Sequence, residues 1–283
     1  MGSIKRSLRM AFTVTMVATL VVMTAGVASA AGPKAKVTYN SVRNNLPGNM
    51  PSQAFQAQQT SEFGDSVALA AGPRNADSVD VVMSSWGCQT GTWNGGDCVT
   101  TPDATFSHPI TLNLYAVDGT SGEPAGPALV TKTQTFAIPF RPSADSVKCT
   151  GSDLGKWYSK ADKTCYSGFA TTITFSGLSG TVLPTNVIWT VAFNTSGFGA
   201  DPIGYDTTCA ASVAGCPYDS LNVGVMSFAG QPSLGTDVDP NGAVLSSITP
   251  TAYCDGGTGG TGALRLDTPC WTGYRPLATI RTK

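Results

Sequence analysis

The chain has 283 residues, of which 41% are hydrophobic and only 12% are charged, and its formal net charge is −1. No basic cluster lies beyond the first nine residues, so the charge pattern argues against nucleic acid or an anionic membrane surface as a partner. Glycine is abundant, with 32 residues, and stretches rich in Glu, Lys and Leu are absent, which favours strands joined by many turns.

The first thirty residues have the pattern of a secretory signal peptide. Three basic residues precede an uncharged apolar run at residues 10–27, and the small residues 28–30 match a cleavage site. Cleavage there removes 3 of the 17 basic residues, leaving 14 against 18 acidic ones and a net charge of −4. The alternative is an uncleaved membrane anchor. We expect a secreted, extracellular protein that is free of the membrane after signal cleavage.

Apolar and polar residues alternate with a period of two in several segments, which is typical of half-buried strands. The stretch from Ser61 to Trp86 is predicted to be a hairpin that turns at residues 71–73, and residues 276–282 are predicted to form a closing edge strand. Between them lie the predicted strands at residues 109–117, 127–138, 169–175, 187–193 and 221–228.

No helical stretch is long enough for a βαβ unit. The sequence therefore predicts an all-β protein, a two-sheet antiparallel β-sandwich of jelly-roll type. We expect one domain over residues 31–283, with a glycine-rich C-terminal segment from about residue 250.

Several of these segments resemble segments of a known protein family. EFGD-x-V-x-LAAGPR followed by SVDVVMSSW, and then HPITLNLYAV, TQTFAIPFRP, IWTVAFNT and DSLNVGV, are similar to segments of a family of secreted bacterial β-sandwich proteins for which no activity is established. The resemblance covers most of Val37 to Pro240. It implies a β-sandwich fold and an extracellular location, and it implies no mechanism.

All eight cysteines lie beyond the signal peptide, so we expect an oxidised framework. They fall into four close pairs, and we predict that neighbours pair so that each bridge staples one loop and contributes about 2–3 kcal/mol. A metal–thiolate site would need C-x-x-C spacing, which the chain lacks. The predicted pairs are Cys88 with Cys98, Cys149 with Cys165, Cys209 with Cys216, and Cys254 with Cys270.

The residues needed for catalysis are scarce. His108 is the only histidine, it sits at the start of a predicted strand, and we expect it to be exposed. The only glutamates are Glu62 and Glu123; Glu123 lies in a turn and is expected to be solvated. No G-x-S-x-G elbow exists, so we assign no catalytic residue. A polysaccharide hydrolase that uses Glu62 or a pair of aspartates remains an alternative.

Two acidic segments are candidate calcium sites. Asp237, Asp239 and Asn241, followed by a glycine, match the first positions of a D-x-D-x-N-G calcium loop. Residue 248, where that loop needs a bidentate glutamate, is an isoleucine. The alternative is an Asp-rich turn whose side chains bond to their own backbone. Glu62 and Asp65 are a second candidate pair of ligands for a structural Ca²⁺ ion.

Loop aromatics next to cysteines suggest a sugar-binding surface, because a flat ring that a disulfide holds in place can stack on a pyranose. The alternative is that each ring covers a disulfide. We expect a non-catalytic protein that binds a polysaccharide or a cell-surface component, or else a structural envelope or matrix protein without a soluble ligand. The candidate ligand-binding residues are Trp93, Trp157, Tyr158, Trp271 and Tyr274.

Overall fold

Antiparallel strands dominate the structure, a computed structural model that describes residues 1–2, 34–55, 57–93, 95–178, 180–193 and 221–283. The described residues from Lys34 to Lys283 form one compact unit, and no helix within the described part of the chain is long and apolar enough to span a membrane. The strands are β1 (Lys36–Asn40), β2 (Ser52–Ala54), β3 (Thr60–Ala68), β4 (Ala76–Ser85), β5 (Thr105–Ala116), β6 (Val130–Pro139), β7 (Trp157–Ser159), β8 (Thr164–Tyr166), β9 (Phe169–Ser176), β10 (Asn186–Ala192), β11 (Leu221–Gly224), β12 (Thr236–Asp237), β13 (Ala243–Ser247), β14 (Arg265–Asp267) and β15 (Ala278–Thr282).

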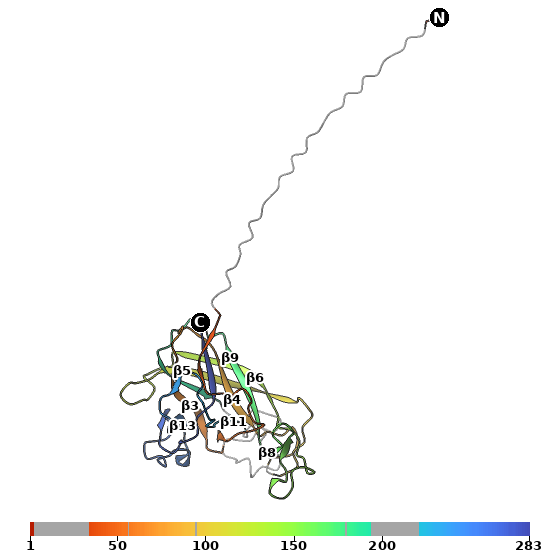
Figure 1. Cartoon of the computed structure of the whole chain (residues 1–283), viewed down its shortest axis with the longest axis vertical. Helices are drawn as coiled ribbons and strands as arrows, with labels where there is room; N and C mark the ends of the chain where they lie inside the picture. The colour runs from red at the N-terminus through yellow and green to blue at the C-terminus, as the bar shows by residue number, and fades with distance from the viewer. Residues whose placement is uncertain (3–33, 56, 94, 179, 194–220) are drawn as a thin grey trace. The chain divides into compact units, whose positions relative to one another are not determined.

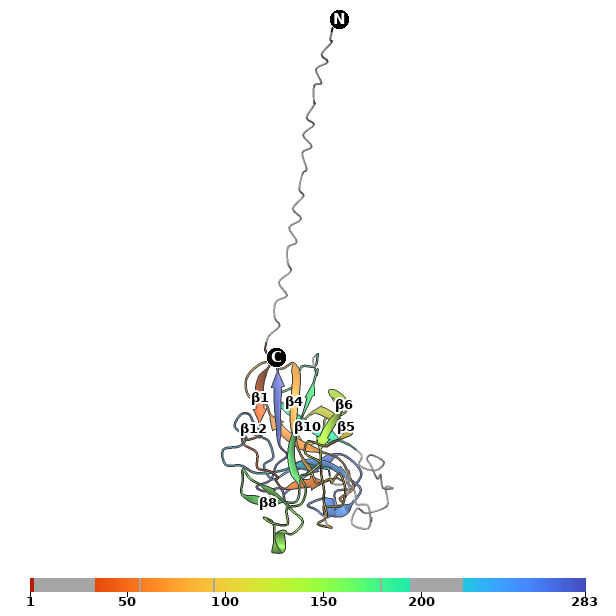
Figure 2. The same ribbon diagram turned by 90° about the vertical axis from the view of Figure 1, so that its right-hand side faces the viewer.

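Among the described residues, six strands form the first sheet, in the order β1-β15-β4-β11-β2, with β9 on the other side of β4. β15 and β11 lie end to end along one edge of β4, pairing with its residues 76–81 and 83–85. The C-terminal β15, blue in Figure 2, runs between β1 and β4.

Seven strands form the second sheet in the described part of the chain, in the order β14-β13-β3-β10-β5-β6. β12 and β13 lie end to end along one edge of β3, with a short excursion of the chain between them. β7 and β8 form a separate hairpin. These two large antiparallel sheets, whose strands are drawn in Figure 1, confirm the predicted two-sheet antiparallel sandwich of jelly-roll type.

The core lies between the two sheets and is made by residues that alternate along each strand. From the first sheet Val79, Val81 and Met83 of β4 point inward, and from the second sheet Leu112 and Trp189 do so; all five are fully buried. Burial of each such side chain stabilises the fold by about 1.5–3 kcal/mol.

The predicted hairpin from Ser61 to Trp86 is wrong. β3 belongs to the second sheet and β4 to the first, so the turn at residues 71–73 carries the chain across the sandwich. The alternation of apolar and polar residues indicates which side of a strand is buried, but it does not indicate with which other strand it pairs. The same limit explains β15, which was expected at an edge and instead has β1 as its outer neighbour.

His108 is also placed differently from the expectation. It lies inside β5, which begins at Thr105, and it is fully buried in phase with Ile110 and Leu112. The His108 ring packs edge-on against Phe193 with centroids 5.5 Å apart, and burial lowers its pKa to about 4. A neutral, buried histidine is a packing residue.

Three of the four predicted disulfides are present: Cys88–Cys98, Cys149–Cys165 and Cys254–Cys270. The fourth predicted pair, Cys209 and Cys216, lies outside the described residues. The loop closed by Cys88–Cys98 packs on the loop closed by Cys149–Cys165, where Gly96 of the first lies against Gly155 of the second. A Cβ on Gly155 would lie 2.6 Å from the Gly96 Cα. The loops of the sandwich are thus stapled as expected.

Side chains of β6 connect the two sheets along one border: the Phe136 ring packs edge-on against Phe175 of β9 with centroids 4.9 Å apart, and Gln134 adds hydrogen bonds. Gln134 of β6 accepts a hydrogen bond from the Ser176 amide at 2.9 Å and donates one to the Thr174 carbonyl at 3.5 Å. Both partners belong to β9, on the side facing away from β4. Gln134 therefore joins an outer strand of one sheet to an outer strand of the other.

Candidate functional site

Two of the predicted aromatic residues, Trp271 and Tyr274, line one open groove. Its volume is about 320 Å³, which is near the lower end of the range for sites that hold a small ligand. Four separate segments build it: strand β2, the turn that follows β2, the short helix at Pro250–Ala252 and the loop of the last disulfide. We call it the aromatic groove; its lining residues are Ser52, Gln53, Ala54, Gln58, Thr251, Ala252, Cys270, Trp271 and Tyr274.

The Trp271 ring is held in place from two directions. Its Nε1 donates a hydrogen bond to the Asp267 carboxylate at 2.9 Å, and its ring packs on Phe63 with centroids 5.3 Å apart. Tyr274 follows in the same turn, where its amide donates to the Trp271 carbonyl at 2.7 Å, and it is 46% exposed. The groove therefore has one fixed ring and one ring that is open to solvent.

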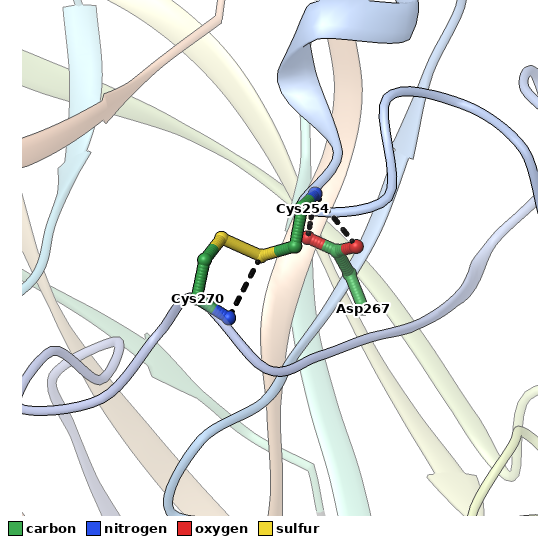
Figure 3. Close-up of side chains that lie close together, drawn as sticks. All are labelled: Cys254, Asp267 and Cys270. Atoms are coloured by element: carbon green, nitrogen blue, oxygen red, sulfur yellow. Dashed lines mark hydrogen bonds between the residues drawn. A yellow bond between two sulfur atoms is a disulfide. The ribbon is translucent and has the colours of Figure 1, made fainter.

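Asp267 connects this anchor to the disulfide. Both of its carboxylate oxygens accept hydrogen bonds from the Cys254 amide, at 3.0 and 3.1 Å (Figure 3). Asp267 is buried, and burial raises the pKa of its carboxyl group. Cys254, Asp267 and Cys270 lie close enough to share a metal ion, but the two sulfurs are bonded to each other. A metal–thiolate site is therefore not available while the bridge is intact.

The other three predicted aromatics do not line the aromatic groove: Trp93 lies in the loop of the first disulfide, and Trp157 and Tyr158 lie in β7. Trp93 is 36% exposed and packs edge-on against Trp86, with centroids 4.9 Å apart. Trp157 is buried, and its Nε1 donates to the Gly168 carbonyl at 2.6 Å, so it differs from the expected exposed ring. Tyr158, next to it, is half-buried.

Glu62 and Asp65, which were predicted to act together, point to opposite sides of β3. Glu62 faces outward, where its Oε1 accepts hydrogen bonds from Asn113 at 2.9 Å, Tyr115 at 2.8 Å and the Thr190 hydroxyl. Three donors on one oxygen make Glu62 part of a network across β3, β10 and β5. The expected pair of ligands is therefore not formed.

Asp65 instead meets Asp237, a member of the other predicted calcium site. Asp65 is 1% exposed, and burial together with the charge of Asp237 raises its pKa well above the usual range. The Asp237 carboxylate lies 3.4 Å from the Arg275 guanidinium, and burial raises its pKa too. We call Asp65 and Asp237 the buried carboxyl pair. The two residues are 172 positions apart in the sequence, so their spacing could not predict that they lie near each other.

Asp239 and Asn241 do not join that pair by hydrogen bonds. Asp239 accepts a hydrogen bond from the Asn241 amide at 3.2 Å, which is the bond of an Asx turn. The Asn241 side-chain oxygen accepts from the Thr272 hydroxyl at 2.7 Å. The two side chains serve the loop, in line with the alternative interpretation of the D-x-D-x-N-G match.

Glu123 likewise differs from the solvated group that was expected. Its carboxylate accepts a hydrogen bond from the Leu266 amide at 2.8 Å and so ties the β5–β6 connection to β14.

Comparison with known proteins adds no relative. No family model matches the chain, no curated protein is significantly similar to it, and no solved structure matches its fold at a significant level. The resemblance to secreted bacterial β-sandwich proteins therefore stays an expectation, and the site must be interpreted from its own geometry.

Proposed function

We propose that this is a secreted, non-catalytic protein that binds a polysaccharide, free or on a cell surface, through the aromatic groove. The observation that carries the proposal is the pair of rings: Trp271 is fixed by Asp267, and Tyr274 is exposed beside it. Aromatic rings next to amide and hydroxyl groups suit a sugar, which offers apolar faces and hydroxyl edges. The three disulfides are typical of an oxidising compartment, which supports secretion.

A hydrolase at Glu62 is less well supported. Retaining and inverting glycosidases need two carboxyl groups about 5–9.5 Å apart. The partners of the Glu62 carboxylate among the described residues are an amide and two hydroxyl groups. Asp65, the nearest carboxylate in the sequence, points to the other side of the sheet.

The test is a depletion assay with the oxidised protein, residues 31–283, on insoluble glycans and purified cell walls. We expect saturable loss of the parent protein to at least one glycan. Tyr274→Ala should weaken this binding by about tenfold, because it removes a stacking ring. Trp93→Ala removes an aromatic side chain outside the groove and is the matched control, so it should bind as the parent does.

Two outcomes would contradict the proposal. If Tyr274→Ala is depleted as fully as the parent, the groove is not the binding site. If no material depletes the parent, the protein is better explained as a structural envelope or matrix protein. Parallel assays with Ca²⁺ and with a chelator show whether a metal ion contributes to binding.

A further inference from the structure

The aromatic groove is uncharged. Its polar lining consists of two glutamines, a serine, a threonine and the hydroxyl of Tyr274. An acidic glycan binds best where arginine or lysine side chains meet its carboxylate or sulfate groups. A lining without charge therefore favours a neutral sugar.

Gln58 offers a hydrogen-bond acceptor that nothing in the described part of the chain uses. Its amide oxygen is buried, and no donor reaches it there. A buried acceptor without a partner is unfavourable. Because Gln58 lines the groove, a rotation of its side-chain amide toward the groove would let this oxygen accept a hydrogen bond from a ligand. That bond would remove the free-energy cost of the unpaired acceptor.

The backbone holds Gln58 firmly in this position. The Ser247 hydroxyl donates a hydrogen bond to the Gln58 carbonyl, and the Thr249 hydroxyl donates to the Gln59 side chain at 2.9 Å. Gln59 has a φ of 47°, a left-handed conformation that is unfavourable for a residue other than glycine. Conformations of this kind persist where surrounding contacts enforce them, and they gather at binding sites.

Ser52 offers the complementary donor. The Asn222 side-chain amide donates a hydrogen bond to the Ser52 oxygen at 3.2 Å, which leaves the Ser52 hydroxyl hydrogen free to point elsewhere. Ser52 lines the same groove as Gln58. The groove thus presents one donor and one acceptor, and each sugar hydroxyl group can serve as either.

We infer that the aromatic groove binds a neutral glycan and that Gln58 recognises it by accepting a hydrogen bond from a sugar hydroxyl group. This inference rests on the glycan-binding function proposed above. Gln58 acts as a specificity residue, because a site that is built to pair with a hydroxyl group rejects a ligand that lacks one.

The experiment measures binding of soluble oligosaccharides by calorimetry with the oxidised protein. The probes are hexamers of β-1,4-linked glucose, N-acetylglucosamine and mannose as neutral glycans, and a hexamer of galacturonate as the acidic one. We expect binding of a neutral hexamer and none of galacturonate. Gln58→Leu should lower the affinity for the neutral hexamer by about tenfold, which is the effect of losing one buried hydrogen bond. Gln58→Glu keeps the acceptor oxygens and should keep most of the affinity.

The controls separate this inference from the function on which it rests. Gln58→Leu removes an acceptor without a partner, so its melting temperature should be at least that of the parent, and a loss of affinity then reflects recognition rather than unfolding. If Tyr274→Ala loses binding while Gln58→Leu binds as the parent does, or if galacturonate is preferred, this inference is overturned and the glycan-binding function stands. If no glycan binds, both fail.

Discussion

At the scale of single residues, the buried carboxyl pair is the feature with the clearest consequence for stability. Burial and the neighbouring charge of Asp237 raise the pKa of Asp65, so folded Asp65 keeps its proton to a higher pH than unfolded Asp65 does. Between the usual aspartate pKa of about 3.9 and the raised value, the folded state binds more protons. The free energy of unfolding therefore falls as the pH rises through this window.

Asp65→Asn should remove this dependence. The amide cannot ionise and can donate a hydrogen bond toward Asp237, so we expect the variant to be more stable than the parent at pH 8 by about 1–3 kcal/mol, with a smaller difference at pH 4. Urea denaturation at pH 4, 6 and 8 measures the effect. Asp103→Asn alters an exposed aspartate and is the control. Parallel pH profiles for Asp65→Asn and the parent would show that Asp65 is ionised in the folded protein.

Some residues of the candidate site could be predicted from the sequence around them, and others could not. Trp271 and Tyr274 could be predicted, because an aromatic residue beside a cysteine stands out in the sequence. Gln58 and Ser52 could not, because a glutamine and a serine in a turn-rich segment carry no pattern of their own. Asp267 was missed for the same reason, since its role depends on contacts with Cys254 and Trp271 that only the fold creates.

At the scale of elements, the close approach of β3 and β10 depends on Gly64. A Cβ on Gly64 would lie 1.8 Å from the Trp189 carbonyl oxygen and 2.6 Å from the Thr190 Cα. Both contacts are with backbone, which cannot move aside as a flexible side chain does. The central pairing of the second sheet therefore requires glycine at this position.

Gly64→Ala should destabilise the protein by at least about 3 kcal/mol, because the added methyl group must push the two strands apart. Guanidinium denaturation of the purified variant measures the loss. Gly119→Ala is the matched control, because a Cβ there meets nothing within 4 Å. Equal stability of the two variants would mean that β3 and β10 shift apart at little cost.

The strands themselves show what periodicity can predict. β4, β5, β9 and β10 carry apolar side chains mostly at alternate positions and were expected within a few residues of their observed bounds. β13 was missed, because all five of its residues are buried and its short apolar run has no alternation. Which strands pair was not predictable, since β3 and β4, neighbours in sequence, lie in different sheets.

At the scale of the whole molecule, the last strand completes the first sheet. β15 lies between β1 and β4, and Leu277, Ala278 and Ile280 are buried in the two apolar clusters. A strand in this position contributes hydrogen bonds on both sides as well as apolar contacts. Its loss would leave β1 without a strand partner and half of β4 open on one side.

Deletion of residues 277–283 should therefore prevent folding. Each large buried side chain is worth about 1.5–3 kcal/mol, and the lost pairing adds to that, so the total approaches the net stability of about 5–15 kcal/mol of a typical domain. Near-ultraviolet circular dichroism and resistance to protease measure the effect. Deletion of Lys283 alone is the control and should leave the protein folded. A folded, protease-resistant protein without residues 277–283 would show that β15 is dispensable.

Gln134 has a consequence beyond the joining of two strands. An outer strand with unpaired backbone groups is a template on which another chain can add, and this is how β-proteins begin to aggregate. The Gln134 side-chain amide is hydrogen-bonded to the Ser176 amide and the Thr174 carbonyl, which are two of the backbone groups that an incoming strand would need on β9. Together with the Phe136 ring, which packs on Phe175 of β9, Gln134 therefore obstructs the addition of another strand along this part of the first sheet.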